Sequence, residues 1–375
     1  RVSATGTGAG NGIRLDGKIT LSGGDLILDG DPAANNYIEY GSGGSAEIEI
    51  SDASSELVVG SQLRRNTLSD DGVITYTQTA GTAIFGANTA PVDSRGVFEI
   101  FNTDDGSAFT LTGAGTTFAI VNGQGNPELG TFILEDGSGS LDVTFDNNAI
   151  IDFGFNGTVA GTIYQNDPNE TYEINSDAAI PNLRIDNDNF NTPILEMVIQ
   201  PLTVSNNLAI LNGGSLVAND FDLTVNSGFT NDGTYTPGVN TTIFNGSTQT
   251  ILGTTATVFN NLDINPTTDV TLGNDITVNQ DLNILTGLLD DAGNRISLLG
   301  NLNITTEHLS DGSGTGGIAM ENPTDPQEMN LPDNEAEIDH LIVDNTEGIT
   351  MNDNSGTATI LTIDQEMAIN DGVFL

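Results

Sequence analysis

Two short phrases recur in the second half of the chain, and they constrain its fold more than any other feature. One reads IPNLRIDN at 180–187, FNNLDINP at 259–266 and IDHLIVDN at 338–345, and its leucines (Leu183, Leu262 and Leu341) follow one another at an even step of about 79 residues. The other reads TVSNNLAI at 203–210, TVNQDLNI at 277–284 and TIDQEMAI at 362–369, and its steps are less even. An even outer period with variable inner spacing indicates a repeat built of several strands joined by loops of variable length.

Apolar residues come in alternating pairs along most of the chain, which is typical of strands with one buried face. Examples are Ile19/Leu21, Ile48/Ile50, Phe98/Ile100, Phe109/Leu111 and Ile151/Phe153. Between Phe98 and Ile151 the pairs recur roughly every 10 residues, separated by clusters rich in Gly, Asn and Asp such as NTDDGS at 102–107. Gly, Asn and Asp tolerate the left-handed backbone of tight turns, so the pattern predicts many short strands.

The predicted fold class is all-β, a right-handed parallel β-helix. The chain has 375 residues, more than one globular core usually holds, but each coil of a solenoid contacts only its neighbours. The step between the repeated phrases is shorter than an immunoglobulin-type domain of about 100 residues. A tandem array of small β-sandwich domains is the alternative.

We expect two segments. Residues 1–165 form an N-terminal β-helical segment, and residues 166–375 form a β-helical segment with repeats at 180–258, 259–337 and, incomplete, 338–375. The proline-containing stretch 164–181 is interpreted as a seam, and 311–337, with three prolines, as a projecting loop. The last residues, AINDGVFL, stop within a repeat. Open strand edges in a solenoid need covering, so we expect further copies or further segments of the same chain end to end.

The charge excludes several partners. Lys and Arg together number 8 against 52 Asp and Glu, a net charge of −44. Such a surface repels nucleic acid and anionic membranes, because both require basic patches. No apolar run approaches the ~20 residues of a spanning helix, so membrane insertion is not expected. The bias favours solubility or a high-salt habitat. Cysteine is absent, which excludes disulfides and thiolate metal sites.

No catalytic, cofactor-binding or metal-binding residue is predicted, and the chain is predicted not to be an enzyme. The motif Asn102-Thr103-Asp104-Asp105 is similar to the paired carboxylates of polygalacturonases, which support inverting glycoside hydrolysis. The Gly-His-Gly and Arg-Ile-Lys elements of that family are absent from the sequence, so the motif is interpreted as a polar turn. A polysaccharide lyase needs clustered basic residues; the one such pair, Arg64–Arg65, is expected on a solvated loop.

Calcium is the one ion that the sequence leaves open. Asp186-Asn187-Asp188-Asn189, Asp70-Asp71-Gly72, Asp104-Asp105 and Asp290-Asp291 offer hard oxygen ligands. The alternative is turn chemistry, in which Asx side chains cap their own backbone. Neither the EF-hand spacing nor the calcium β-roll repeat occurs. Separately, Asn206, Asn207, Asn279 and Asn303 are expected to stack between coils as amide ladders.

The stretch TTIFNGSTQTILGTTATVFNNLDINPTTDVTLGNDITVNQDLNILTGLL at 241–289 resembles repeats of very large Bacteroidota surface proteins, among them gliding-motility adhesins exported by the type IX system. The resemblance covers the second half of the chain well and the first half in composition only. It implies a non-enzymatic, extracellular or cell-surface structural or adhesive protein, a rigid acidic rod within an adhesin, stalk or filament, with surface glycans as further partners. The alternatives are a carbohydrate-active or carbohydrate-binding β-helix of the tailspike or glycanase kind, and a calcium-stabilised β-sandwich stalk.

Overall fold

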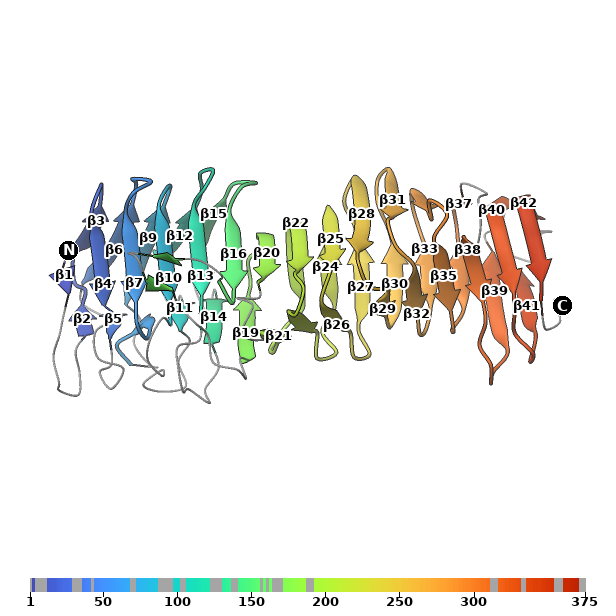
Figure 1. Cartoon of the computed structure of the whole chain (residues 1–375), viewed down its shortest axis with the longest axis horizontal. Coiled ribbons are helices and arrows are strands. Elements are labelled where there is room, and N and C mark those ends of the chain that lie inside the picture. The colour runs from blue at the N-terminus through green and yellow to red at the C-terminus, as the bar shows by residue number, and fades with distance from the viewer. Residues whose placement is uncertain are drawn as a thin grey trace. The chain divides into compact units, whose positions relative to one another are not determined.

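The computed structural model of the chain consists of short parallel β-strands stacked side by side (Figure 1). It describes residues 2–3, 12–28, 36–41, 44–67, 72–86, 97–101, 106–121, 130–135, 141–155, 158–159, 162–163, 171–186, 192–310, 316–331, 335–353 and 360–370. Within these residues there is no helix, and hence none able to cross a membrane. Contacts divide the chain into two compact units, unit 1 (1–202 and 210–216) and unit 2 (203–209 and 217–375).

Unit 1 is built of coils with three strands each, and equivalent strands of successive coils pair in parallel. The first column contains β1 (Val2–Ser3), β4 (Asp25–Leu28), β7 (Glu56–Val59), β10 (Thr82–Phe85), β13 (Thr117–Ile120), β16 (Ile150–Phe153) and β20 (Ile180–Ile185). The second contains β2 (Gly12–Arg14), β5 (Tyr37–Tyr40), β8 (Leu63–Arg65), β11 (Phe98–Phe101), β14 (Gly130–Glu135), β19 (Thr171–Ser176) and β21 (Ile194–Met197). The third contains β3 (Lys18–Leu21), β6 (Ser45–Ile50), β9 (Val73–Gln78), β12 (Ala108–Leu111) and β15 (Asp142–Phe145).

Aromatic rings fill the interior of unit 1. Phe98 and Phe132, in register on β11 and β14, stack with their centroids 5.5 Å apart. Tyr76 and Phe109 do the same on β9 and β12, at 5.3 Å, and Phe118 meets Phe98 edge-on at 4.9 Å. In-register stacking places equivalent side chains one coil apart, a distance at which offset and edge-to-face ring pairs are favourable.

Unit 2 has the same architecture with shorter coils. Its first column contains β24 (Leu223–Val225), β27 (Thr241–Phe244), β30 (Asn261–Ile264), β33 (Leu282–Ile284), β36 (Leu302–Ile304), β39 (Gln327–Leu331) and β41 (Ile349–Asp353). Its second contains β25 (Gly228–Asn231), β28 (Thr248–Gly253), β31 (Asp269–Leu272), β34 (Leu288–Asp290) and β37 (Glu307–Leu309). Its third contains β29 (Thr257–Phe259), β32 (Ile276–Val278), β35 (Arg295–Leu298) and β38 (Gly317–Met320).

Seven further strands complete the described elements. β40 (Glu335–Val343) pairs with β37 through its first part and with β38 through its second, and β42 (Ile360–Ile369) pairs with β40. β26 (Thr234–Thr236) lies between β25 and β27 in the chain, and β17 (Thr158–Val159) and β18 (Thr162–Ile163) form an antiparallel pair. β22 (Leu202–Ile210) and β23 (Ser215–Val217) contribute residues to both units.

The number of residues per coil differs between the two units, and it equals the sequence separation of in-register partners on neighbouring coils. In unit 1, the in-register partners Lys18 and Glu47 are 29 residues apart in the chain, and Asp152 and Arg184 are 32 residues apart. In unit 2, in-register partners of the β30 column, such as Asp263 and Asn283, are 20 residues apart. The step between the repeated phrases is therefore not the step between stacked positions. Leu262 pairs within the β30 column, whereas Leu341 pairs with Ile318 of β38.

The parallel pairings confirm the predicted β-helix, since a tandem array of sandwiches would pair its strands antiparallel. The loop predicted over 311–337 is wrong, because β38, β39 and the start of β40 lie within it and continue the stack. Its prolines Pro323 and Pro326 fall in a corner turn, where Asn322 accepts hydrogen bonds from the backbone of Thr324 and Asp325. The segment boundary at 165/166 and the repeat boundaries stay predictions.

Candidate functional site

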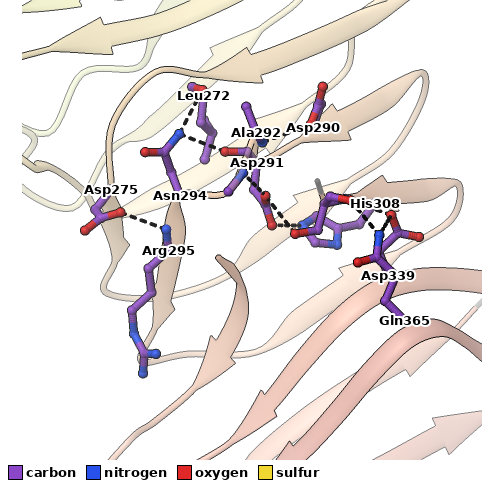
Figure 2. A network of polar contacts seen from close by, with 12 residues as sticks. Leu272, Asp275, Asp290, Asp291, Ala292, Asn294, Arg295, His308, Asp339 and Gln365 are labelled. Atoms are coloured by element: carbon purple, nitrogen blue, oxygen red, sulfur yellow. Dashed lines mark hydrogen bonds and ion pairs between the residues drawn. The ribbon is translucent and has the colours of Figure 1, made fainter. Parts of the chain in front are cut away.

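A buried polar network in unit 2 joins side chains from several coils (Figure 2). It begins at the turn between β34 and β35. Asp290 Oδ1 accepts a hydrogen bond from the backbone N–H of Ala292 at 2.9 Å, and Asp291 Oδ1 accepts one from Gly293 at 2.7 Å. Ala292 and Gly293 adopt φ values of 50° and 82°. These are Asx-turn contacts, so the aspartate pair shapes the backbone here, as the alternative to calcium binding predicted.

His308 and Asp291 face each other in the core. Nε2 of His308 lies 3.2 Å from Oδ2 of Asp291, and both side chains are fully buried. The hydroxyl of Ser310 donates to Asp291 Oδ1 at 3.0 Å. A serine protease triad needs the hydroxyl on the histidine, whereas here the carboxylate joins both groups. Ser310 and Gly293 satisfy Oδ1 of Asp291, whereas Oδ2 of Asp291 and both ring nitrogens of His308 are buried without a hydrogen bond. His308 and Asp291 therefore form a close contact and not a hydrogen-bonded pair.

The network continues to the next coils. The backbone N–H of Ser310 and the side-chain amide of Gln365 both donate to Asp339 Oδ2, at 2.9 Å each. Asp339 also lies in a group with Glu337 and Asp364, in which one carboxylate oxygen of each residue lies within 4.8 Å of those of the other two. Carboxylate oxygens are the ligand type that Ca²⁺ prefers, but two donors already engage Asp339. Calcium stays the one ion that the sequence leaves open.

The arginine pair predicted on a solvated loop is buried in β8, so that prediction is wrong. Arg64 and Arg65 are 4% and 6% exposed. Nε of Arg65 lies 2.5 Å from Oε1 of Glu99, and the guanidinium of Arg64 lies 4.2 Å over the ring of Tyr37 and 3.7 Å from Oε2 of Glu39. Each charge is compensated by a carboxylate from a neighbouring coil. The pair forms internal ion pairs and leaves no basic patch for an anionic sugar.

A further ion pair, between a buried aspartate and a partly exposed arginine, lies in the first column of unit 1. One in-register row on β4, β7, β10 and β13 consists of buried apolar residues: Ile27, Val58, Ile84 and Ala119. The next residue of this row, on β16, is Asp152. Asp152 is fully buried and forms an ion pair with Arg184 of the following coil. Burial raises the pKa of Asp152 to about 7, against the lowering effect of Arg184. Nε of Arg184 also lies 3.9 Å from Asp186.

A row of side-chain amides runs along the β30 column. We call Asp263, Asn283, Asn303, Asn330 and Asn352 the amide ladder; they are in-register neighbours on β30, β33, β36, β39 and β41. Each Nδ2 donates to the Oδ1 of the preceding coil, at 2.6, 2.6, 2.7 and 3.2 Å in chain order. The expected ladder role is confirmed for Asn303. The other asparagines named from the sequence lie elsewhere: Asn206 and Asn207 on β22, and Asn279 just after β32.

The remaining sequence-predicted positions lie outside the described residues. These are Asn102, Thr103, Asp104 and Asp105, the aspartates Asp70 and Asp71, and the stretch 187–189. All but one of the ladder members that sequence reasoning missed share one signal. Asp263, Asn283 and Asn330, like Asn303, each sit between two buried apolar positions, in the segments NLDI, DLNI, EMNL and NLNI that begin at 261, 281, 328 and 301. Asn352 lacks this signal, because its neighbour Met351 is exposed.

Comparison with known proteins adds no relative. No protein-family model, no curated protein and no solved structure matches the chain.

Proposed function

We propose that the chain is a non-enzymatic structural or adhesive element of the bacterial cell surface, an acidic β-helical part of an adhesin, stalk or extracellular filament. The resemblance of 241–289 to repeats of Bacteroidota surface proteins supports this proposal. Because such proteins are exported by the type IX system, the proposal includes export by that route. The strong negative charge favours solubility and discourages lateral aggregation.

The observation that carries the proposal is the way polar side chains are used in unit 2. The asparagines of the amide ladder hydrogen-bond to one another from coil to coil. In the neighbouring row, Asn301 Nδ2 donates to Asp281 Oδ1 at 3.1 Å, and the backbone N–H of Glu328 donates to Asn301 Oδ1 at 2.8 Å. Side chains placed in this way add hydrogen bonds between coils to those of the backbone. This construction favours stiffness along the stacking direction.

The same proposal implies its partners. Parallel coils expose backbone donors and acceptors at a strand edge, and solenoids cover such edges with further chain. Further copies or further segments of the same chain are therefore the proposed neighbours, end to end. Surface glycans are the proposed adhesion target, since a neutral polyhydroxylated ligand avoids the repulsion that −44 charges impose on acidic polymers.

Electron microscopy of native material from producing cells, with gold-labelled antibody against the chain, tests the proposal. Label along threads or stalks outside the cells is the expected result. Continuous fibres with a regular axial repeat would identify a filament subunit, and single threads of irregular length a segment of a large adhesin. Label confined to the cell interior, or compact isolated particles, would contradict the proposed function.

A further inference from the structure

We infer that Asp263 fixes the direction in which the amide ladder hydrogen-bonds along unit 2. The inference concerns how the coils are ordered and does not depend on the proposed function. Its basis is the single carboxylate at the N-terminal end of a row that otherwise contains asparagine.

A row of asparagines alone has two equivalent directions. Each side-chain amide carries a donor Nδ2 and an acceptor Oδ1, so every amide in the row can turn over and the hydrogen bonds can run either way. The structure shows one direction throughout, with Nδ2 of Asn283, Asn303 and the following members donating toward the preceding coil.

A carboxylate removes this freedom because it only accepts hydrogen bonds. Asn283 must present Nδ2 to Asp263, at 2.6 Å. Its Oδ1 then faces the next coil, so Asn303 must present Nδ2 in turn, also at 2.6 Å. One ionised group thereby orients each amide that follows it. The contact at Asp263 is also the strongest of the row, since hydrogen bonds to an ionised acceptor are about twice as strong as neutral ones.

Asp263 is partly buried. Burial raises its pKa, and the hydrogen bond from Asn283 opposes this rise by favouring the ionised form. Buried polar groups are costly when they lack a partner. If the amide of Asn283 turned over, its Oδ1 would face the carboxylate oxygen of Asp263 and its Nδ2 would lose this acceptor. The reversed ladder is therefore disfavoured.

A second carboxylate in the middle of the ladder tests the inference. In the Asn303→Asp variant, residue 303 cannot donate to Asn283, and Asn283 cannot turn over because Asp263 holds its Nδ2. We expect amide hydrogen exchange of β30, β33 and β36 in the full chain to accelerate by about tenfold, about 1.4 kcal/mol. Peptides from unit 1, such as 108–121, serve as the internal reference.

Adding Asp263→Asn to this variant is expected to restore protection. With no carboxylate at 263, Asn283 can turn over, and the hydrogen bonds then converge on residue 303 from both sides. Asp281→Asn is the matched control, because it also removes one negative charge near position 303. Asp281 is offset from position 303 by one coil and two residues, about 8 Å, whereas Asp263 lies two coils away, about 10 Å. If Asn303→Asp acts only through charge repulsion, Asp281→Asn should restore protection at least as well as Asp263→Asn, because Asp281 is nearer. If it acts through the ladder, only Asp263→Asn should restore protection.

The comparison stays informative if Asn303→Asp prevents folding of unit 2, because recovery of folding then becomes the measured quantity. Rescue by Asp263→Asn without rescue by Asp281→Asn supports the inference. Equal rescue by both variants, rescue by neither, or an Asn303→Asp chain as protected as the wild type would overturn it.

Discussion

Replacing Asp152 with asparagine is expected to change how the stability of unit 1 depends on pH. Asp152 lies in register between Ala119 and Arg184, and its carboxylate is fully buried. Burial raises its pKa from the ordinary value of 3.8 to about 7, and the neighbouring Arg184 opposes this only in part. Between these values the folded chain holds a proton that the unfolded chain has released.

The sign and size of the effect follow from proton linkage. The free energy of unfolding falls as pH rises wherever the folded state binds more protons. The stability that protonated Asp152 contributes is therefore fully present below pH 3.8 and is lost as pH rises through about 7. At about 1.4 kcal/mol per pH unit, this interval corresponds to about 4 kcal/mol, of which about 2 to 3 kcal/mol is lost between about pH 5 and about pH 8. The Asp152→Asn variant cannot ionise at this position and escapes that loss.

Urea denaturation of the wild-type chain and of Asp152→Asn at about pH 5 and about pH 8, followed through hydrogen exchange of unit 1 strands, measures the effect. Both proteins keep all other carboxylates, so the titration of those groups cancels in the difference between them. The stability of the variant relative to the wild type is expected to rise by about 2 to 3 kcal/mol from the lower to the higher pH. A difference that stays constant within about 0.5 kcal/mol would show that Asp152 is ionised throughout, and would refute the reasoning.

Three further substitutions test other parts of the structure. Asp291→Ala should lower the free energy of unfolding of unit 2 by about 3 kcal/mol or more, because His308 and Ser310 lose their buried partner; unchanged hydrogen exchange in β34 and β37 would contradict this. Gly246→Ala places a Cβ atom 1.8 Å from the backbone oxygen of Asn226 and should cost about 2 kcal/mol in urea denaturation; full stability would show that the corner can widen. Phe98→Ala removes a fully buried ring from the aromatic interior and should cost unit 1 about 3 to 5 kcal/mol, with a loss below about 1 kcal/mol counting against the stacked core.

The fold was predictable because alternating apolar pairs report strands directly. Pairs such as Phe98/Ile100 and Phe109/Leu111 are fully buried on β11 and β12. The coil length was hidden, because the repeated phrases recur at a much longer step than the 20 residues that separate stacked neighbours such as Asp263 and Asn283. The short motifs NLDI and DLNI carry that smaller step, but their polar positions vary between Asp and Asn.

The buried polar groups were harder to predict, because their partners are distant in sequence. The sequence alone predicts Arg65 at the surface. In the structure, coil stacking places Glu99, which is 34 residues away in the chain, 2.5 Å from Arg65. His308 and Asp291 are likewise joined only by the placement of β37 on β34. The prolines at 323 and 326 led to the prediction of a projecting loop, whereas they lie in a corner between stacked strands.

Parallel, in-register coils are the central claim, and disulfide trapping tests it most directly because the chain contains no cysteine. Thr277 and Ser297 are in-register, partly exposed neighbours on β32 and β35. Their Cα atoms should lie about 4.8 Å apart, within the range that a disulfide bridges. The Thr277→Cys/Ser297→Cys variant should oxidise readily in the folded chain, whereas Asn279→Cys/Ser297→Cys, offset by two residues and about 8 Å apart, should not. Bridging of the offset pair instead of the in-register pair would contradict the stacked parallel register.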